Sequence, residues 1–397
     1  MPDLPLRRPA IPRSVWALGL VSLFTDIGSE MVHSLLPLLL VGSLGASGLV
    51  IGLIEGTAEA LVLIVKVFSG YLSDAWGRRK PLVLLGYGLA ALSKPLFPMA
   101  GSVSTIVAAR LLDRFGKGIR GAPRDALIAD VTPVAIRGSA FGLRQAMDTL
   151  GAVVGPLCAV ALMTVLLGDI RAVLWFAVLP GLIAVALIVF AVREPESPGR
   201  PARLPITREG LASLGKPYWM LVAVAALLAL ARFSEAFLIL RGAQLGLADA
   251  HVPLVLVAMS VIYALSSWPS GSFSDRYGRR ALFVVGVLVL VLADGVLALA
   301  TGPVGVFAGA ALWGLHLGMT QGVLSAMIVD ASGEQRRGTA FGVYGLASGV
   351  GLLVASVVAG AVWDGWGGQS TFALGGVLAA LTLAAAMFWM PRNRNMP

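Results

Sequence analysis

The sequence predicts an all-helical membrane protein in which twelve transmembrane helices form two bundles of six. The mean hydropathy is +0.87 and only 13% of the 397 residues are charged, whereas soluble domains carry about 25% charged residues. Long apolar stretches recur along the chain, and the second half repeats motifs of the first. Because these stretches are continuous rather than alternating with polar residues, they predict helices and not a β-barrel.

Each predicted transmembrane helix corresponds to one apolar stretch. A helix needs about 20 mostly apolar residues to cross the hydrocarbon layer of a membrane. The stretches that meet this requirement lie, in order, at residues 14–41, 48–73, 81–101, 103–128, 138–166, 170–193, 217–244, 250–274, 280–301, 303–329, 338–364 and 368–391.

Lys and Arg are concentrated in the loops on one side of these spans. They occur at both ends of the chain and in the loops after even-numbered spans, whereas the opposite loops contain only Arg171 and Arg241. Basic loops stay in the cytoplasm. We therefore expect both termini in the cytoplasm of a multi-pass protein of the inner or plasma membrane.

A stretch rich in Pro and charge, residues 194–216, is predicted to be a cytoplasmic linker. It divides the chain into an N-terminal bundle, residues 1–193, and a C-terminal bundle, residues 217–397. Each bundle then holds six of the predicted spans.

Two motifs of the first half return in the second half. "GYLSDAWGRRKPL" (70–82) matches "GSFSDRYGRRALF" (271–283), and "IRGSAFGLRQA" (136–146) matches "RRGTAFGVYGL" (336–346). Because six spans separate the copies, both copies have the same orientation in the membrane. Transporters built from such parallel repeats bind their substrate near the membrane midplane, between the halves.

These motifs resemble those of the major facilitator superfamily. The loop signature G-x-L-x-D-x-x-G-R-[RK] is met at Gly70, Leu72, Asp74, Gly77, Arg78 and Arg79, and again at Gly271, Asp275, Gly278, Arg279 and Arg280, with Phe273 in place of Leu. In the fourth span, Arg114 and Gly118 match R-x-x-Q-G-x-G, with Lys117 and Arg120 as replacements. In the fifth span, Gly151, Gly155 and Pro156 match the antiporter signature G-x-x-x-G-P.

The resemblance implies a gate at the cytoplasmic side. Asp74 would contact the start of span 11, and Asp275 the start of span 5. The carboxylates suit a helix N-terminus because its free N–H groups favour negative charge. Two arginines would then pair with acids at the ends of spans 4 and 10: Arg78 with Asp130, and Arg279 with Asp330. The simpler alternative is that these charges only orient the helices in the membrane.

The fourth span carries a stripe of cations. Arg110, Arg114, Lys117, Arg120 and Arg124 follow one another at three- and four-residue steps, which places them on one helix face. Arg114 and Lys117 lie about 16 to 21 Å along the helix, where one charge costs about 2.5 to 3.5 kcal/mol. Two interpretations remain open. The cations either pair with embedded acids or face a cavity that binds an anionic group, and Arg114 and Lys117 are the stronger cavity candidates.

The resemblance also implies that spans 1, 4, 7 and 10 line a central cavity. The candidates for substrate binding are Arg114, Lys117, Arg232, His316, Gln321 and, in span 5, Arg144. The candidates for proton coupling are Asp26, Glu30, Glu235 and Asp148. Low dielectric and nearby cations shift a carboxylate pKa in opposite directions, so such groups can bind and release protons as the cavity changes. Alternatively, they form permanent ion pairs that never titrate.

The sequence thus predicts a proton-coupled secondary transporter that moves a small anionic or zwitterionic organic solute by alternating access. The span 5 signature favours export by antiport. The alternatives are an uptake symporter for an anionic metabolite, or an exporter of a metal chelate or a cationic drug. We expect a monomer without a cofactor or a nucleic-acid partner, because the excess positive charge lies in short loops.

Two further alternatives carry less weight. Asp26, Glu30 and His33 share one face of span 1, and with His316 they have the ligand types for a divalent cation. An enzyme and an ATP-driven pump are both disfavoured. The sequence contains no nucleophile elbow, no H-E-x-x-H motif and no phosphate-binding loop G-x-x-x-x-G-K-[ST].

Overall fold

The computed structural model describes residues 10–194, 208–332 and 336–390, and all regular structure there is helical. The first half of the chain supplies ten helical segments. They are α1 (Arg13–Leu38), η1 (Leu39–Ser43), α2 (Gly48–Trp76), α3 (Lys80–Ser93), α4 (Leu96–Met99), α5 (Val103–Val131), η2 (Val134–Ile136), α6 (Arg137–Val165), α7 (Ile170–Phe176) and α8 (Val178–Ala191).

The second half supplies seven segments. They are α9 (Arg208–Ala212), α10 (Lys216–Ala231), α11 (Ala236–Gln244), α12 (Leu254–Tyr277), α13 (Arg279–Leu299), α14 (Pro303–Ser332) and α15 (Arg337–Trp389). The last of these is two helices that meet at Gly367, whose φ of 80° is not helical. Glycine accepts this left-handed conformation without a steric penalty.

These segments confirm an all-helical membrane protein with about twelve crossings. Ten segments are long and apolar enough to span a membrane by composition alone. The charged helix α5 crosses the same distance but carries too many cations to meet that criterion, and α15 contains two crossings. Most of the predicted linker lies outside the described residues, and its last part forms the short helix α9.

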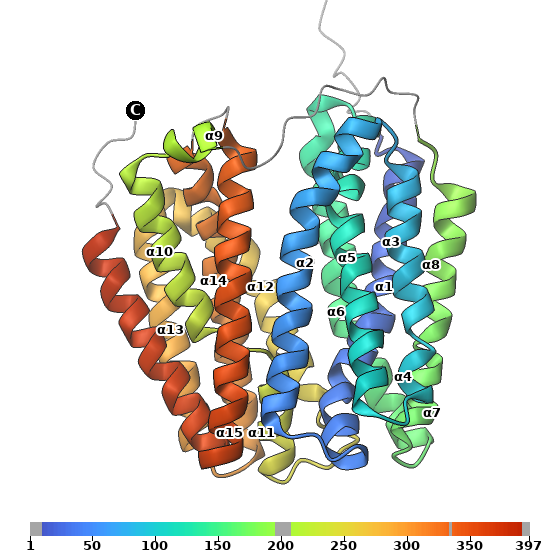
Figure 1. The fold of residues 1–397 in the computed structure, drawn as a ribbon, viewed down its shortest axis with the longest axis vertical. Coiled ribbons are helices and arrows are strands. Elements are labelled where there is room, and N and C mark those ends of the chain that lie inside the picture. The colour runs from blue at the N-terminus through green and yellow to red at the C-terminus, as the bar shows by residue number, and fades with distance from the viewer. Residues whose placement is uncertain (1–9, 195–207, 333–335, 391–397) are drawn as a thin grey trace, which may run out of the picture.

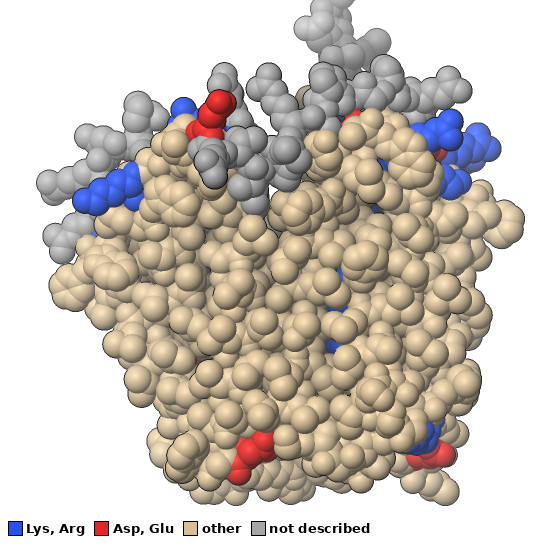
Figure 2. Space-filling model, viewed as in Figure 1, with Lys and Arg blue, Asp and Glu red and all other residues tan. Residues whose placement is uncertain are grey.

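The two halves lie side by side (Figure 1). Helix α2 of the first half packs along α15 of the second, and α6 packs along α12. Helix α1 begins and α15 ends at the same side of the molecule, which we call the termini side; the other is the opposite side (Figure 1). In Figure 2, Lys and Arg gather mainly along the termini side, and the middle of the molecule is almost free of surface charge.

The halves touch most closely near the opposite side. A Cβ atom added at Gly52 of α2 would lie 2.0 Å from the carbonyl oxygen of Ser356 in α15. One added at Gly360 of α15 would lie 2.2 Å from the carbonyl oxygen of Gly48. Asp364 completes the contact, because its carboxylate accepts from the backbone N–H groups of Gly48 at 2.7 Å and Leu49 at 2.9 Å. Only glycine permits this approach of two backbones.

Near the termini side the same two helices diverge around a pocket of about 560 Å³. Its walls include Tyr71 and Asp74 at the end of α2, and Gly338 and Phe341 at the start of α15. The structure is therefore closed at the opposite side and open between the halves at the termini side.

Candidate functional site

A polar cavity of about 350 Å³ lies between the two halves. Helices α1, α2 and α5 line it from the first half, and the α10–α11 break, α14 and α15 line it from the second. The lining residues are Glu30, His33, Glu55, Glu59, Arg114, Lys117, Arg232, Phe233, Ser234, Glu235, Trp313, Gln321 and Leu352. The cavity thus brings together six of the predicted site residues: Glu30, Arg114, Lys117, Arg232, Glu235 and Gln321.

The second half reaches this cavity through a break in its first span. The sequence predicts one continuous helix over 217–244, but residues 232–235 are not helical and separate α10 from α11. Serine hydroxyls satisfy the freed N–H groups: Ser356 Oγ accepts from the Ser234 N–H at 3.2 Å, and Ser234 Oγ accepts from the Ala236 N–H at 3.2 Å. The break presents Arg232 and Glu235 to the cavity, as discontinuous helices do in other transporters.

In the first half, a buried network orients His33. An Arg110 guanidinium nitrogen donates to Glu55 Oε2 at 2.5 Å and lies 2.9 Å from His33 Nδ1. Arg110 and Glu55 are each no more than 2% exposed. Because arginine can only donate, Nδ1 of His33 must accept, and the neutral ring carries its proton on Nε2.

The His33 Nε2 atom faces the other half. It lies 3.9 Å from Glu235 Oε2, which belongs to the break between α10 and α11. His33 therefore connects the buried network of the first half to a carboxylate of the second half. The proton on Nε2 of His33 points toward the Glu235 carboxylate, and the distance between them increases if the two halves separate here.

Arg114 lies in the cavity wall but has partners. One guanidinium nitrogen lies 3.0 Å from Glu59 Oε1, and its Nε lies 3.7 Å from Asp113 Oδ2. Asp113 in turn pairs with Lys94 at 2.9 Å, where both side chains are almost fully buried. Internal pairing, the first of the two interpretations of the cationic stripe, thus describes Arg114 and Arg110.

Three charged cavity residues make no ion pair among the described residues: Glu30, Lys117 and Arg232. Lys117 comes from α5 and Arg232 from the break in the second half, so a free cation stands on each side. Lys117 thus lines the cavity without an ion-pair partner, as the second interpretation of the cationic stripe requires, and its binding of an anionic group stays a prediction. Gln321 adds a polar contact, since Tyr263 Oη donates to its Oε1 at 3.1 Å.

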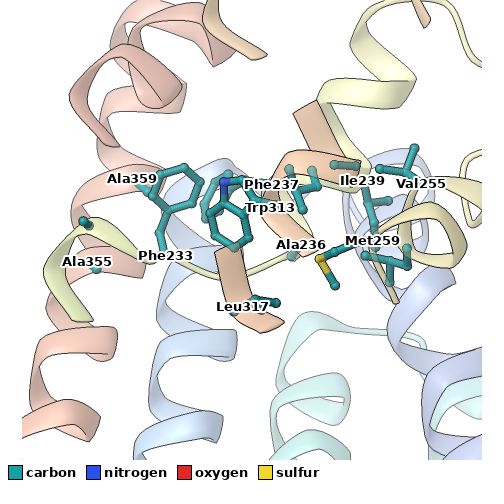
Figure 3. Close-up of a cluster of buried hydrophobic side chains, with 14 of the residues drawn as sticks. Phe233, Ala236, Phe237, Ile239, Val255, Met259, Trp313, Leu317, Ala355 and Ala359 are labelled. Atoms are coloured by element: carbon teal, nitrogen blue, oxygen red, sulfur yellow. The ribbon is translucent and has the colours of Figure 1, made fainter. Parts of the chain in front are cut away.

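Aromatic side chains form the wall of the cavity in the second half. Phe233 lies 5.8 Å from Trp313 and 5.3 Å from Phe372 between ring centroids. Figure 3 shows Phe233 and Phe237 beside Trp313 in this cluster. Trp313 Nε1 donates to Asp294 Oδ1 at 2.9 Å, which fixes the indole plane. A solute in the cavity thus has a charged side and an aromatic side.

Four predicted site residues lie elsewhere. His316 is fully buried, and its Nδ1 lies 2.7 Å from the Gly286 carbonyl oxygen instead of facing the cavity. Arg144, Asp148 and Asp26 belong to a second cluster nearer the termini side. There Arg144 bonds Asp148 at 2.8 Å, Asp148 lies 3.9 Å from Arg124, and Asp26 lies 3.9 Å from Arg120. Each of these side chains points toward its nearby polar partner and not into the cavity that the helix spacing predicts.

The glycines of the fifth-span signature pack α6 against α1. A Cβ atom at Gly151 would lie 2.8 Å from Asp26 Cβ, and one at Gly155 would lie 2.8 Å from Glu30 Cβ. Pro156 lies within α6, directly after this contact. The signature therefore lies directly behind two of the predicted proton-coupling residues.

One of the predicted gate pairs has a different partner in the structure. Asp130 bonds Arg79 Nε at 2.5 Å, and Arg79 also holds Asp74 at 3.0 Å. Arg79 directly precedes α3 and reaches both acids, so the expected pairing of Arg78 with Asp130 is wrong. In the second half, Arg279 pairs with Asp330 as predicted. The side chain of Asp275 lies outside the described part of the structure.

The alternative of a bare metal site finds no support in the arrangement. His316 faces a backbone carbonyl group, away from Asp26, Glu30 and His33. Among the described residues, no three His, Cys, Asp or Glu side chains are grouped closely enough to hold a metal ion.

Sequence reasoning missed the aromatic wall and the break in the first span of the second half. Phe233 and Trp313 are typical of any apolar span, so composition does not distinguish them. The break had one signal, the segment "RFSE", because two charges and a serine interrupt an otherwise apolar run.

Comparisons with known proteins show the family and the fold. A profile of the family described as Major Facilitator Superfamily matches residues 18–241 and 222–396. A protein of Methanocaldococcus jannaschii, described as an uncharacterized MFS-type transporter, is 31% identical over 385 residues, which cover 95% of each chain. The inner membrane transport protein YajR of Escherichia coli is 25% identical over 393 residues, covering 95% of this chain and 83% of YajR. The crystal structure of a mutant of the nucleoside transporter NupG has a similar fold, with a TM-score of 0.81 at 13% identity over 95% of this chain and 100% of that chain.

Proposed function

Because the chain belongs to the major facilitator superfamily, and is thus a multi-pass membrane transporter and not an enzyme, we propose that it couples proton movement to the transport of a small anionic or zwitterionic solute. The observation that carries this proposal is the cavity between the halves. Among the described residues it combines two cations and one carboxylate that form no ion pair, Lys117, Arg232 and Glu30, with a histidine, and both halves contribute to it.

The solute would bind through opposite charges. Lys117 and Arg232 have no carboxylate partner in the described part of the chain and can hold an anionic group from two sides, while Glu30 can hold an ammonium group. Arg114 holds the cavity wall through Glu59, and Gln321 contributes a neutral polar contact. A cavity of about 350 Å³ suits a solute of metabolite size.

Proton coupling would pass through Glu235, Glu30 and His33. The Nε2 proton of His33 faces Glu235 at 3.9 Å across the interface of the halves. Movement of the halves changes this distance and with it the proton affinity of both groups. Asp26 and Asp148, in the second cluster, would hold protons nearer the termini side.

Alternating access would proceed by movement of the two bundles, residues 1–193 and 217–397, around the cavity. In this proposal the termini side is cytoplasmic, so the structure is the inward-open state. In the other state, Asp74 would contact the start of span 11 in the second half and close that side. The pairs of Arg79 with Asp74 and Asp130, and of Arg279 with Asp330, each lie within one half and are already formed here. Export by antiport is the proposed direction, because the fifth-span signature packs against Asp26 and Glu30.

The proposal is tested in proteoliposomes that enclose a pH-sensitive dye. Anionic, zwitterionic, cationic and metal-chelate compounds are added outside, and the internal pH is followed. An anionic or zwitterionic solute should change the internal pH. Antiport raises the internal pH as the solute enters, and symport lowers it, so the sign distinguishes export by antiport from an uptake symporter.

Glu235→Gln separates coupling from binding. For one coupled proton, a gradient of one pH unit drives about tenfold solute accumulation. The variant should lose this accumulation and still bind the solute, because glutamine keeps the size of the side chain but does not titrate. Asp249→Asn, which removes an exposed carboxylate from a loop of the opposite side, is the control and should accumulate normally.

Two results would contradict the proposal. Full accumulation by Glu235→Gln would remove Glu235 from coupling. If only cationic compounds moved protons, Lys117 and Arg232 would have a structural role, and the protein would be an exporter of cationic drugs.

A further inference from the structure

A second pocket, independent of the transport cavity, lies at the termini side of the second half. It has a volume of about 520 Å³. Three helix ends form it: the start of α10, the start of α13 and the end of α15. The lining residues are Lys216, Pro217, Met220, Arg280, Met387, Phe388, Trp389 and Met390. In Figure 1, α10, α13 and the last part of α15 lie at the edge of the molecule that is farthest from the first half, where lipid surrounds it.

The pocket is cationic at its rim and apolar below. Lys216 and Arg280 are the charged lining residues, and the described lining contains no acid. Arg280 donates to the Met387 carbonyl oxygen at 2.5 Å, which holds its guanidinium group over the pocket, and its Nε is buried without a partner. Phe388 is 81% exposed and Trp389 47% exposed beside it, as aromatic residues are at the headgroup level of a membrane.

The first half shows what such a position binds. There Lys80 corresponds to Arg280 by its contacts, because its Nζ donates to the carbonyl oxygens of Val189 and Val192 at the end of α8. The carboxylate of Glu194 then accepts from the backbone N–H groups of Arg79 and Lys80 at the start of α3. An anion of the chain itself thus neutralises this corner of the first half.

In the described part of the second half, no carboxylate lines the corresponding pocket. The residue before α13 is Gly278, which has no side chain to accept from the first N–H groups of the helix. Glu194 comes two residues after Val192, the residue that directly follows α8. Two residues after Met390, the corresponding residue of α15, the sequence has Arg392. In sequence, Arg392 thus follows α15 at the spacing at which Glu194 follows α8, and the described lining of the pocket supplies no carboxylate for its two cations.

We infer that this pocket binds the phosphate headgroup of an anionic phospholipid, with Lys216 and Arg280 contacting the phosphate and the acyl chains lying along Met220, Phe388 and Trp389. Basic pockets between helix ends are typical sites for anionic headgroups. The lipid would serve as the counterpart of Glu194 and would hold the ends of α10, α13 and α15 together.

Native mass spectrometry of the full chain in detergent tests the inference. Phosphatidylglycerol and phosphatidylcholine of equal chain length are titrated separately, and inorganic phosphate is titrated as a third ligand. The wild type should retain phosphatidylglycerol in preference to phosphatidylcholine. Each cation removed by Lys216→Gln or Arg280→Gln should weaken phosphatidylglycerol binding about fivefold.

Matched variants distinguish a specific lipid site from nonspecific electrostatic attraction of anionic lipid to the basic side of the protein. Arg276→Gln removes a cation from the same side of the same half, outside the pocket, and should leave binding unchanged. Glu194→Gln removes the internal anion of the first half and should add a second phosphatidylglycerol molecule. If retention by the wild type is equal for both lipids, or if Arg276→Gln weakens binding as much as Arg280→Gln, the inference is wrong. Displacement of the lipid by inorganic phosphate at equal concentration would also overturn it, because the site would then recognise phosphate alone.

Discussion

At the scale of single residues, Lys94 and Asp113 form an ion pair that is almost fully buried in the first half. The atoms lie 2.9 Å apart, and Lys94 also donates to Ser29 Oγ at 3.0 Å. Two charges removed from water together gain little net stability, but one of them left alone is costly. The pair therefore contributes chiefly by fixing α3 against α5 and α1.

Lys94→Met should lower the free energy of unfolding by about 3–5 kcal/mol, because Asp113 then keeps only the more distant Arg114. The double variant Lys94→Met with Asp113→Leu should recover most of this loss, since no buried charge remains without its partner. Unfolding by denaturant in detergent measures both values. Equal losses in the single and double variants would show that the pair is not the cause.

The sequence predicts which charges are embedded but not how they pair. The spacing of Arg114 and Lys117 is equivalent, and both are expected to face the cavity. Only the structure distinguishes them, because Glu59 lies within ion-pair distance of Arg114, whereas no described carboxylate lies that close to Lys117. The same limit explains Arg78 and Arg79, which are adjacent and chemically identical. Long side chains choose partners by distances of a few ångströms, which depend on packing between helices.

At the scale of helices, the contact of α2 with α15 depends on the absence of side chains. Gly52→Ala places a Cβ atom 2.0 Å from the Ser356 carbonyl oxygen, so the backbones must move apart. Overpacking of this kind costs about 1–3 kcal/mol. The free energy of unfolding should fall by that amount.

The matched control for this prediction is Gly88→Ala in α3, where the added Cβ meets nothing within 4 Å. Alanine favours a helix over glycine, so this variant should be neutral or more stable. Equal losses in both variants would exclude the close contact as the cause.

Most helices could be predicted from the sequence, because apolar length determines where a chain crosses a membrane. The start of α2 at residue 48 and of α5 at residue 103 agree with the predicted spans. The breaks within spans could not be predicted. Residues 232–235 leave the helix because Ser356, more than a hundred residues away, accepts one of the freed N–H groups.

At the scale of the whole molecule, closure of the opposite side depends on one carboxylate. Asp364 of the second half accepts from two N–H groups at the start of α2 in the first. Asp364→Asn removes the negative charge that this helix N-terminus favours, and the opposite side should open more often.

Spin labels at Ser43 and Asp249, which lie on the opposite side in the first and second half, measure this opening. Their distance distribution should gain a longer component in Asp364→Asn. Asp169→Asn, a change at the start of α7 within the first half alone, should leave the distances unchanged. An unaltered distribution in Asp364→Asn would show that the glycine contact suffices to keep the side closed.

The two halves share a fold but differ in buried charge. Where the first half pairs Lys94 with Asp113, the second half joins Asp294 to Trp313, with the same separation of 19 residues. Motif repetition predicts the shared fold, because it reflects helix ends and packing. It does not predict this divergence, which leaves the charges mainly on one wall of the cavity and the aromatic rings on the other.

The charge of α5 has a consequence for biosynthesis. With its cations exposed, this helix is too polar to partition into lipid by itself. Its counter-charges, Glu55 and Glu59 of α2 and Lys94 after α3, leave the ribosome earlier. The insertion machinery must therefore keep α2 and α3 close by until α5 arrives, so that this part of the first half enters the bilayer as a group of helices and not one helix at a time.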